Sequence, residues 1–207
     1  MNYEEQVRPL LAEFDNTIRS VAGVCFDAME GFSLNVKEIE KHQREFIEKS
    51  DSKEPADVQM RHLDSAWILY GEGNPNDSGT ILHHRSTQKD FKVRNSEGGN
   101  NLNFIGNMGL ITIYHYWDEL YRVRIGNICG VNKNEVQCDV FGDMRLIRNS
   151  ILHNNGIAKE DVRKCKTLQW FKSGDSIVID KAKFLELLRS LRSLRISVGK
   201  QTPITLK

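Results

Sequence analysis

The sequence predicts an all-α or mainly α fold. Apolar residues recur three and four positions apart over several long stretches, which is the period of an amphipathic helix. The chain has 207 residues, of which 39% are hydrophobic and 28% charged, and it contains four prolines. This composition is ordinary for a folded helical protein. A chain of this length can bury a sizeable core, and we expect one compact domain overall.

Residues 1–95 are expected to form N-terminal helices and a long loop that pack on the rest of the chain. An apolar stripe predicts a first helix that ends at Gly31. A second helix is predicted over residues 33–49, with the hydroxyl of Ser33 as its cap. A third helix is predicted over residues 56–70.

Two clusters rich in Gly and Asn predict that residues 71–101 form a long connection. Connections of this length are often functional. Between the clusters lies the triplet His83-His84-Arg85, which offers either a metal or phosphate site or an ordinary solvated loop. No Asp or Glu is close to it in the sequence, so we favour the solvated loop.

Residues 96–207 are expected to hold the core of a helical bundle. Residues 103–128 are apolar around much of the helix circumference, which predicts a central helix. The next helix is predicted over residues 135–153. It is expected to end at the run Asn154-Asn155-Gly156, because Asn and Gly tolerate the left-handed backbone that closes helices.

The C-terminal part is expected to add a minor β-hairpin and a last helix. Residues 168–179 place two apolar strand-like segments around the turn Ser173-Gly174-Asp175. The final helix is predicted over residues 181–196. Three arginines repeat along it at every third position: Arg189, Arg192 and Arg195. This stripe is either an RNA phosphate contact or a solvated face, and we favour the solvated face.

Charge and cysteine content limit the class of protein. The net charge is +1 and the pI about 7.7, so any nucleic-acid contact must come from a local basic patch. The four cysteines lack metal-binding spacing and are expected to be buried free thiols; no metal or cofactor is expected. No apolar stretch is long enough to cross a membrane, and the acidic N-terminus lacks a secretory signal. We therefore expect a cytoplasmic protein.

The strongest candidate site lies on the helix that ends near Gly156. At about 100° per residue, Asn149 and His153 are neighbours on one face, and Arg145 lies on the same polar side. Arg148 falls at the edge of the buried stripe, about 140° from His153. Its long side chain can bend across Asn149 towards the imidazole.

These residue types suit phosphodiester cleavage without a metal. His153 lies at a helix C-terminus, where the backbone dipole favours the imidazolium and raises basicity. A histidine that titrates near neutrality can donate or accept a proton. Arg148 offers a permanent charge and forked donors for phosphate oxygens. Asn149 is expected to orient the imidazole or to hold substrate.

This segment resembles the R-x4-6-H motif of the HEPN superfamily, with a polar residue after the arginine: Arg148-Asn149-Ser150-Ile151-Leu152-His153. The longer run from Asp143 to Asn154 strengthens the resemblance. The aromatic segment Tyr116–Tyr121 is similar to the partner helix of bacterial members. The resemblance covers about residues 100–157 and implies a HEPN-like up-and-down helical bundle; none is evident over residues 1–95.

Membership implies a homodimer in which two such helices bring both Arg/His sets to one cleft. Many HEPN proteins are metal-independent endoribonucleases that use the ribose 2′-hydroxyl as nucleophile. The implied catalytic residues are Arg148, His153 and Asn149. Arg145 and Asn154 are expected to contact RNA. Asp118 or Glu119 is expected to support a catalytic side chain from the neighbouring helix.

Two functional classes remain open at this stage. One is a ribonuclease acting as a toxin or antiviral-defence effector, with an antitoxin or regulatory protein as partner. The other is a catalytically inactive HEPN-like module that binds RNA, a nucleotide or a protein.

Overall fold

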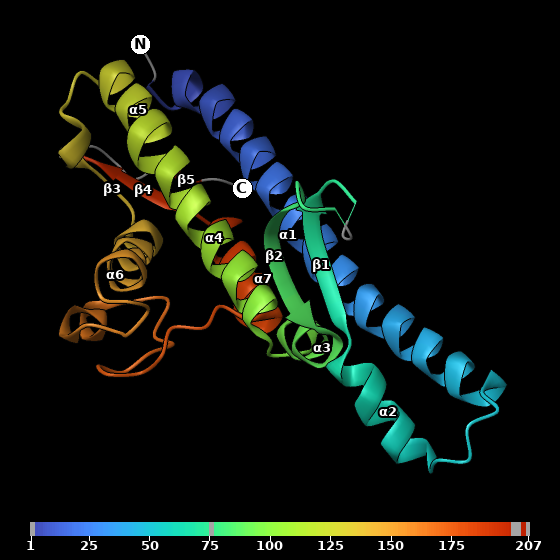
Figure 1. The fold of residues 1–207 in the computed structure, drawn as a ribbon. Helices are drawn as coiled ribbons and strands as arrows, with labels where there is room; N and C mark the ends of the chain where they lie inside the picture. The colour runs from blue at the N-terminus through green and yellow to red at the C-terminus, as the bar shows by residue number, and fades with distance from the viewer. Residues whose placement is uncertain (1–2, 75–76, 200–203, 206–207) are drawn as a thin grey trace. The chain divides into compact units, whose positions relative to one another are not determined.

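The computed structural model describes residues 3–74, 77–199 and 204–205, and it is mainly α-helical (Figure 1). The chain divides into two compact units. Unit 1 is formed by residues 1–27 and 103–207, and unit 2 by residues 28–102. One boundary between the units follows Asp27 and the other follows Leu102.

Helix α1 runs without a break over Tyr3–Lys49. The prediction of two helices separated at Gly31 is therefore wrong. A glycine in a helix interior costs only about 1 kcal/mol relative to alanine, which a long amphipathic helix tolerates. Gly31 does not take the left-handed conformation that would end a helix. Ser33 is not a cap, since its hydroxyl donates to the carbonyl of Met29 within the helix at 3.2 Å.

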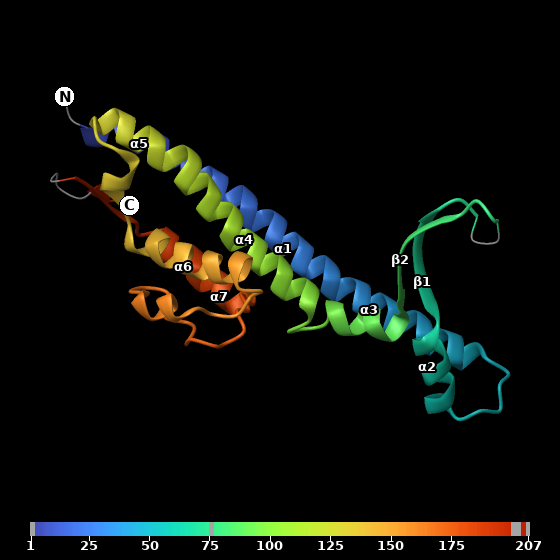
Figure 2. The same ribbon diagram turned by 60° about the vertical axis from the view of Figure 1, so that its left-hand side comes forward.

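The centre of unit 1 is a helical run close to the predicted central helix. It comprises α4 (Asn100–Tyr116), a π-helical turn (Trp117–Tyr121) and α5 (Arg122–Cys129). The N-terminal part of α1 lies alongside this run (Figures 1 and 2). The Phe14 ring of α1 lies 4.4 Å from the Tyr121 ring between centroids. The apolar side chains of both helices therefore form one core.

Helix α6 spans Asp139–His153. It starts later than predicted, because a 3₁₀ turn (Lys133–Glu135) and the short strand β3 (Val136–Gln137) come first. Its predicted end is confirmed. Asn155 and Gly156 have φ angles of 53° and 75°, and the amide of Gly156 donates to carbonyls in the last turn of α6. This is the left-handed closure expected of Asn and Gly.

The predicted hairpin over residues 168–179 does not form. Residues 172–175 make a turn, and Ser176 instead bridges to Ile157. Helix α7 spans Lys181–Leu191, shorter than predicted. The segment after it forms β4 (Arg195–Val198), which pairs with β3 and with β5 (Ile204–Thr205) in an antiparallel sheet.

The shortening of α7 has a physical cause. Ile196 and Val198 are β-branched and buried, and Val198 pairs with Val136 of β3. Such long-range pairing overrides local helix propensity. Because Arg195 lies in a strand and Arg189 in α7, the arginines do not form the predicted helical stripe.

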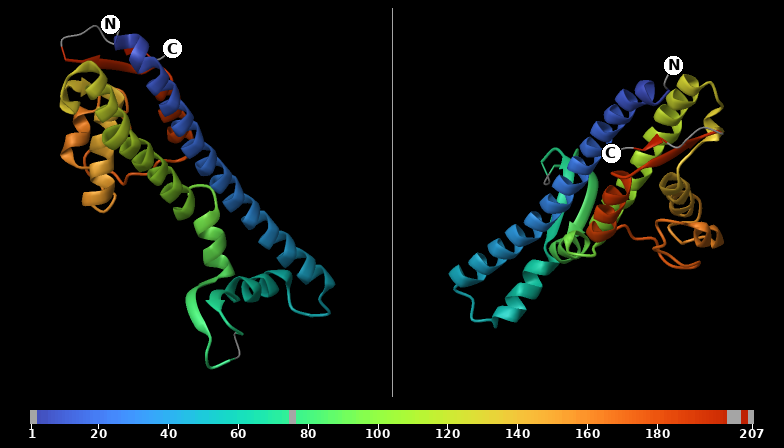
Figure 3. Two further views of the ribbon diagram at one scale, coloured as in Figure 1. Left: turned by 90° about the horizontal axis from the view of Figure 1, so that it is seen from above. Right: turned by 180° about the vertical axis from the view of Figure 1, so that it is seen from behind.

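Unit 2 contains two strands and a helix that the sequence did not indicate. Helix α2 ends at Ser65 (Ala56–Ser65), and β1 follows over Trp67–Glu72. Strand β2 (Ile81–Thr87) pairs with β1 antiparallel, and α3 spans Gln88–Asn95. Figure 3 shows β1 and β2 side by side. The helix predicted to reach Tyr70 and the structureless connection over 71–101 are both wrong.

A buried polar cluster joins the helices of unit 2. Gln43 of α1 is buried. Its amide nitrogen donates to Asp64 and to Gln88, each at 2.9 Å, and its amide oxygen accepts from Lys92 at 3.0 Å. Lys92 also forms a 2.6 Å ion pair with Asp64. Every polar group of Gln43 is thus satisfied, which burial requires. Within the described ranges, no helix is both long and apolar enough to cross a membrane.

Two helical glycines of unit 1 should respond in opposite ways to alanine. A Cβ on Gly106 would overlap the carbonyl oxygen of Ile179, whereas a Cβ on Gly23 would meet nothing within 4 Å. We expect Gly106→Ala to destabilise unit 1 by about 1–3 kcal/mol through overpacking. Gly23→Ala should stabilise it by about 0.5–1 kcal/mol. Urea denaturation followed by circular dichroism measures both, and equal effects would contradict the packing of α4 on residue 179.

Candidate active site on helix α6

A groove of about 630 Å³ opens in unit 1 beside helix α6. One wall is formed by Tyr114 and Trp117, from α4 and the π turn. The α6 wall presents Arg145, Leu146 and Asn149, and other walls come from residues 134–139 and 161–166. Two of the residues assigned to the site from sequence, Arg145 and Asn149, therefore line one cavity.

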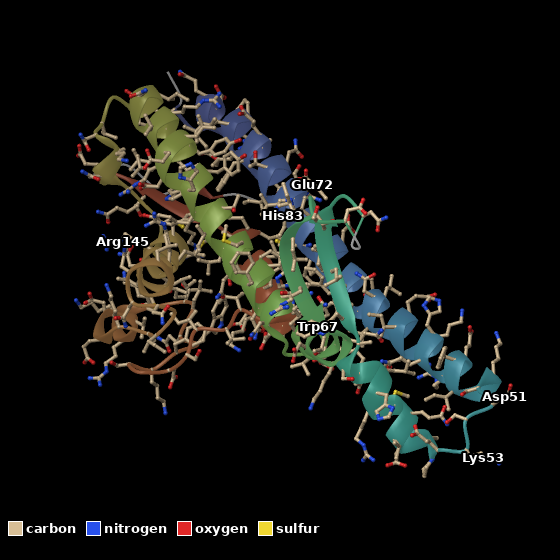
Figure 4. The ribbon with its side chains drawn as sticks, viewed as in Figure 1. Asp51, Lys53, Trp67, Glu72, His83 and Arg145 are labelled. Atoms are coloured by element: carbon tan, nitrogen blue, oxygen red, sulfur yellow. The ribbon has the colours of Figure 1, made fainter. Side chains whose placement is uncertain are left out.

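Most of the basic groups around this groove are neutralised by a nearby carboxylate. Three ion pairs do this: Arg122–Asp118 at 2.7 Å, Lys164–Asp161 at 2.5 Å and Lys166–Asp139 at 2.7 Å. Arg145 differs, since among the described residues no hydrogen bond or ion pair reaches its exposed guanidinium. Figure 4 shows Arg145 on the α6 side of the molecule. Arg145 is thus the basic lining residue without an ion pair in the described part of the chain, and Asp161 acts on it only at longer range.

Arg148 is half-buried and held in place by two neighbours. Its guanidinium carbon lies 5.6 Å from the centroid of the Tyr114 ring, within the range of a cation–π contact. Its Nη1 donates to Oδ1 of Asn149 at 3.3 Å. Burial, aided by Asp118, raises the pKa of the Tyr114 phenol, so this ring is neutral near pH 7. A neutral ring and an amide leave the charge of Arg148 uncompensated.

His153 is the last residue of α6 and is exposed. The helix is regular through this residue, so Arg148 and His153 stay about 140° apart around its axis. The Arg148 side chain reaches Asn149, and no hydrogen bond among the described residues joins it to His153. Asn154 donates its amide to the carbonyl of Ile157 at 2.7 Å and so helps to close the helix.

The two acidic residues proposed as supports make other contacts. Asp118 accepts from Nη1 of Arg122 at 2.7 Å and lies 3.5 Å from Nζ of Lys133. Burial acts to raise the pKa of Asp118, but Arg122 and Lys133 outweigh it and hold that pKa below its usual range. Glu119 is exposed, 3.9 Å from the same lysine. Arg122 in turn donates to the carbonyl of Val136 at 2.9 Å, so Asp118 fixes a groove wall.

Asp143 is a groove residue that the sequence analysis did not assign to the site. Its carboxylate is only 2% exposed, and it accepts from the backbone amides of Lys166, Thr167 and Leu168 at 2.6–3.0 Å. It therefore fixes the loop that forms one groove wall. In the sequence, the feature that could have identified Asp143 is its position: it is a charged residue beside Met144, on the buried face of α6. The nearby Cys165 thiol is buried, and this burial, together with the negative charge of Asp143, raises the pKa of the thiol to about 12.

Three further expectations concern the cysteines, a metal site and the histidine pair. All four cysteines are free, and three are buried as predicted, while Cys138 is half-buried. Among the described residues, no group of three or more His, Cys, Asp or Glu side chains is arranged to hold a metal ion. The expectation that no acid lies near His83 is wrong. Strand pairing brings Glu72 to 2.9 Å from its Nε2.

No family model, curated protein or solved structure matches this chain.

Asp143 should be far more important for stability than its exposed neighbour on the same helix. We expect Asp143→Ala to cost about 2–4 kcal/mol, because three buried amides lose their acceptor. Asp139→Ala removes an ion pair with Lys166 in which both side chains are exposed, and it should cost much less, because such pairs contribute little to stability. Denaturant titration of the two variants provides the comparison. Similar losses from both would mean that the 166–168 loop does not depend on the buried carboxylate.

Proposed function

We propose that this chain is a metal-independent endoribonuclease that acts in the cytoplasm as a homodimer, with its active site on α6. One observation carries the proposal. Helix α6 presents two cations that form no ion pair with a described residue, Arg145 and Arg148, and ends in an exposed histidine, His153. Metal-free phosphodiester cleavage requires phosphate-binding cations together with a group that transfers protons, and α6 carries both, although on different sides of the helix.

The chemistry follows from the charges of these groups. A neutral imidazole removes the proton from the ribose 2′-hydroxyl, whose oxygen attacks the adjacent phosphorus. The P–O5′ bond breaks, and an imidazolium donates its proton to the departing 5′-oxygen. The products are a 2′,3′-cyclic phosphate and a free 5′-hydroxyl. Arg148 stabilises the charge that develops on the phosphate oxygens, and Asn149 fixes the guanidinium by its hydrogen bond.

Two chains are needed because the reaction requires a base and an acid. Each chain supplies one His153, and within a chain this histidine lies far around the helix from Arg148. A second α6 related by a two-fold axis brings another guanidinium and imidazole to the same cleft. The resemblance of the 148–153 segment to the HEPN motif supports this arrangement.

The other residues assigned from sequence take supporting roles in this proposal. Arg145 binds an RNA phosphate at the groove, and Asn154 contacts RNA with the carboxamide oxygen and the second N–H that its bond to Ile157 leaves unused. Asp118 and Glu119 act through Arg122 and Lys133 on the groove wall. An antitoxin or regulatory protein that covers α6 would restrain the activity. The role as a toxin or antiviral-defence effector rests on analogy alone.

A second candidate is a module that binds RNA without cutting it. The contact of Arg148 with Tyr114 and Asn149 favours this candidate, because it keeps the guanidinium from the imidazole of its own chain. Both candidates place RNA phosphates on Arg145 and Arg148. They differ in whether His153 transfers protons.

Cleavage of a mixed RNA in excess EDTA tests the proposal. We expect wild-type protein to cut and to leave 2′,3′-cyclic phosphate ends. The His153→Ala variant should be slower by at least about a hundredfold, as loss of an acid–base group predicts. The control is His42→Ala, which removes another exposed helical histidine.

The outcomes of this experiment distinguish the nuclease from the RNA-binding module. Absence of wild-type cleavage, or equal cleavage by wild type and His153→Ala, refutes the nuclease. If RNA is then still bound and binding weakens in Arg148→Ala, the binding module is the correct function.

A further inference from the structure

Three arginines near the end of unit 1 form a patch of positive charge, which we call the arginine patch: Arg189, Arg192 and Arg195. Arg189 lies in α7, Arg192 directly follows that helix, and Arg195 is the first residue of β4. All three are exposed, and none forms an ion pair with a described residue. Residues 187–199 contain these arginines and no acidic residue, in a chain whose net charge is only +1.

The fold keeps the three side chains on the solvent side. Leu187 and Leu191 are buried on the opposite side of α7. Arg192 keeps a helical backbone, so it lies about 60° around the axis from Arg189. Arg195 follows three residues later, and three residues span at most about 11 Å. This is comparable with the Debye length of about 10 Å at 0.1 M salt, so neighbouring charges of the patch act together on an anion.

The arginine patch is connected to the α6 groove through the small sheet. Strand β4 lies between β3 and β5 (Figure 1), and Ser197 of β4 lies opposite Gln137 of β3. Opposite residues, and residues two apart along a strand, point to the same face of a sheet. Arg195 therefore shares a face with Gln137, which lines the groove together with Arg145. The backbone N–H of Arg195 also interacts with the thiol of Cys138, another groove residue.

The acidic groups closest to this path have other partners. Asp139, which follows Cys138, forms its ion pair with Lys166 at 2.7 Å. Asp143 accepts hydrogen bonds from the 166–168 loop. Glu186, one turn before the patch on α7, forms no ion pair with the arginines in the described part of the chain. The positive charge of the patch is therefore open to an anion from outside the chain.

We propose that the arginine patch binds the phosphates of a single RNA strand that extends from the α6 groove across β3 and β4. This specifies the substrate as a single strand longer than the groove, and it rests on the proposed RNA binding at α6. Guanidinium groups offer phosphate oxygens forked, charge-assisted hydrogen bonds. The strand thus contacts Arg145 in the groove and then the patch.

The groove residues favour a single strand of RNA over other anions. Gln137 and Asn149 line the groove with carboxamides, which both donate and accept hydrogen bonds. Unpaired bases present edges that need such partners, whereas the bases of a duplex are already paired. An acidic protein surface would match the arginines but would not supply these edges. The combination of a cation row with recessed carboxamides therefore fits phosphates and bases together.

Binding of two labelled single-stranded RNAs by full-length His153→Ala protein tests this proposal, because loss of the histidine keeps the RNA intact. An RNA of about 4 nucleotides fills only the groove, whereas one of about 16 also reaches the patch. We expect Arg189→Gln, Arg192→Gln and Arg195→Gln together to weaken binding of the long RNA by at least about tenfold. The slope of log K against log salt should fall by about 2, or about 0.7 per lost contact. Affinity for the short RNA should not change. Fluorescence anisotropy measures each affinity.

Two control proteins separate the patch from general charge effects. The first replaces Arg8, Arg19 and Arg61 by glutamine, which removes the same total charge at exposed ion pairs elsewhere. It should bind both RNAs as the starting protein does. The second replaces the three patch arginines by lysine, which keeps the positive charge, and it should retain most of the affinity for the long RNA.

The outcomes separate this proposal from the proposed function. If Arg145→Gln weakens RNA binding but the patch glutamine variant does not, α6 remains the RNA site and the patch is not part of it. Equal losses in the patch variant and the charge-matched control also overturn the patch. If the starting protein binds neither RNA, both proposals fail. If the patch variant keeps its RNA affinity but loses binding of poly-glutamate, the patch is a docking surface for an acidic protein.

Discussion

The stacking of Phe141 on Trp117 sets the position of α6, and with it every residue of the candidate site. The two rings lie 4.2 Å apart with an interplanar angle of 8°, and Phe14 of α1 packs against both. This contact joins three helices that are distant in sequence. It turns the stripe of Met144 and Ile147 towards the core, and so it turns Arg145, Asn149 and His153 towards solvent. A different rotation of α6 would bury the cations.

Helical periodicity predicted α6 and its end, because the information lies within a few residues of each position. Val140, Met144 and Ile147 recur four and three positions apart and define the buried face of the helix, and Asn155 with Gly156 defines its end. Strands β1 and β4 were not predicted, because the residues that determine them are far away in the sequence. Trp67–Tyr70 and Ile196–Val198 are apolar runs that a helix or a strand can use equally well. Only pairing with β2 or β3, which is invisible locally, decides between them.

The candidate site, too, could be predicted only where its pattern lies within a few residues of one helix. The spacing of Arg148, Asn149 and His153 on one helix is a local pattern, so the sequence predicts them as a set. The structure joins Arg148 to Asn149 but leaves His153 about 140° away around the helix. Asp143 was missed because its partners are backbone amides more than twenty residues away, and an amide has no sequence signature. The contact of Glu72 with His83 was missed for a similar reason, since a strand turn brings them together. For Asp143 and Glu72, a long-range contact determines what the carboxylate binds.

The central claim is that two copies of α6 complete one cleft, and subunit mixing tests it most directly. Wild-type protein is exchanged with about a tenfold excess of His153→Ala, so that most wild-type chains pair with a variant chain. If each cleft needs both histidines, the RNA cleavage per wild-type chain falls by about tenfold. If cleavage per wild-type chain is unchanged, one chain carries a complete site and the shared-cleft account is wrong.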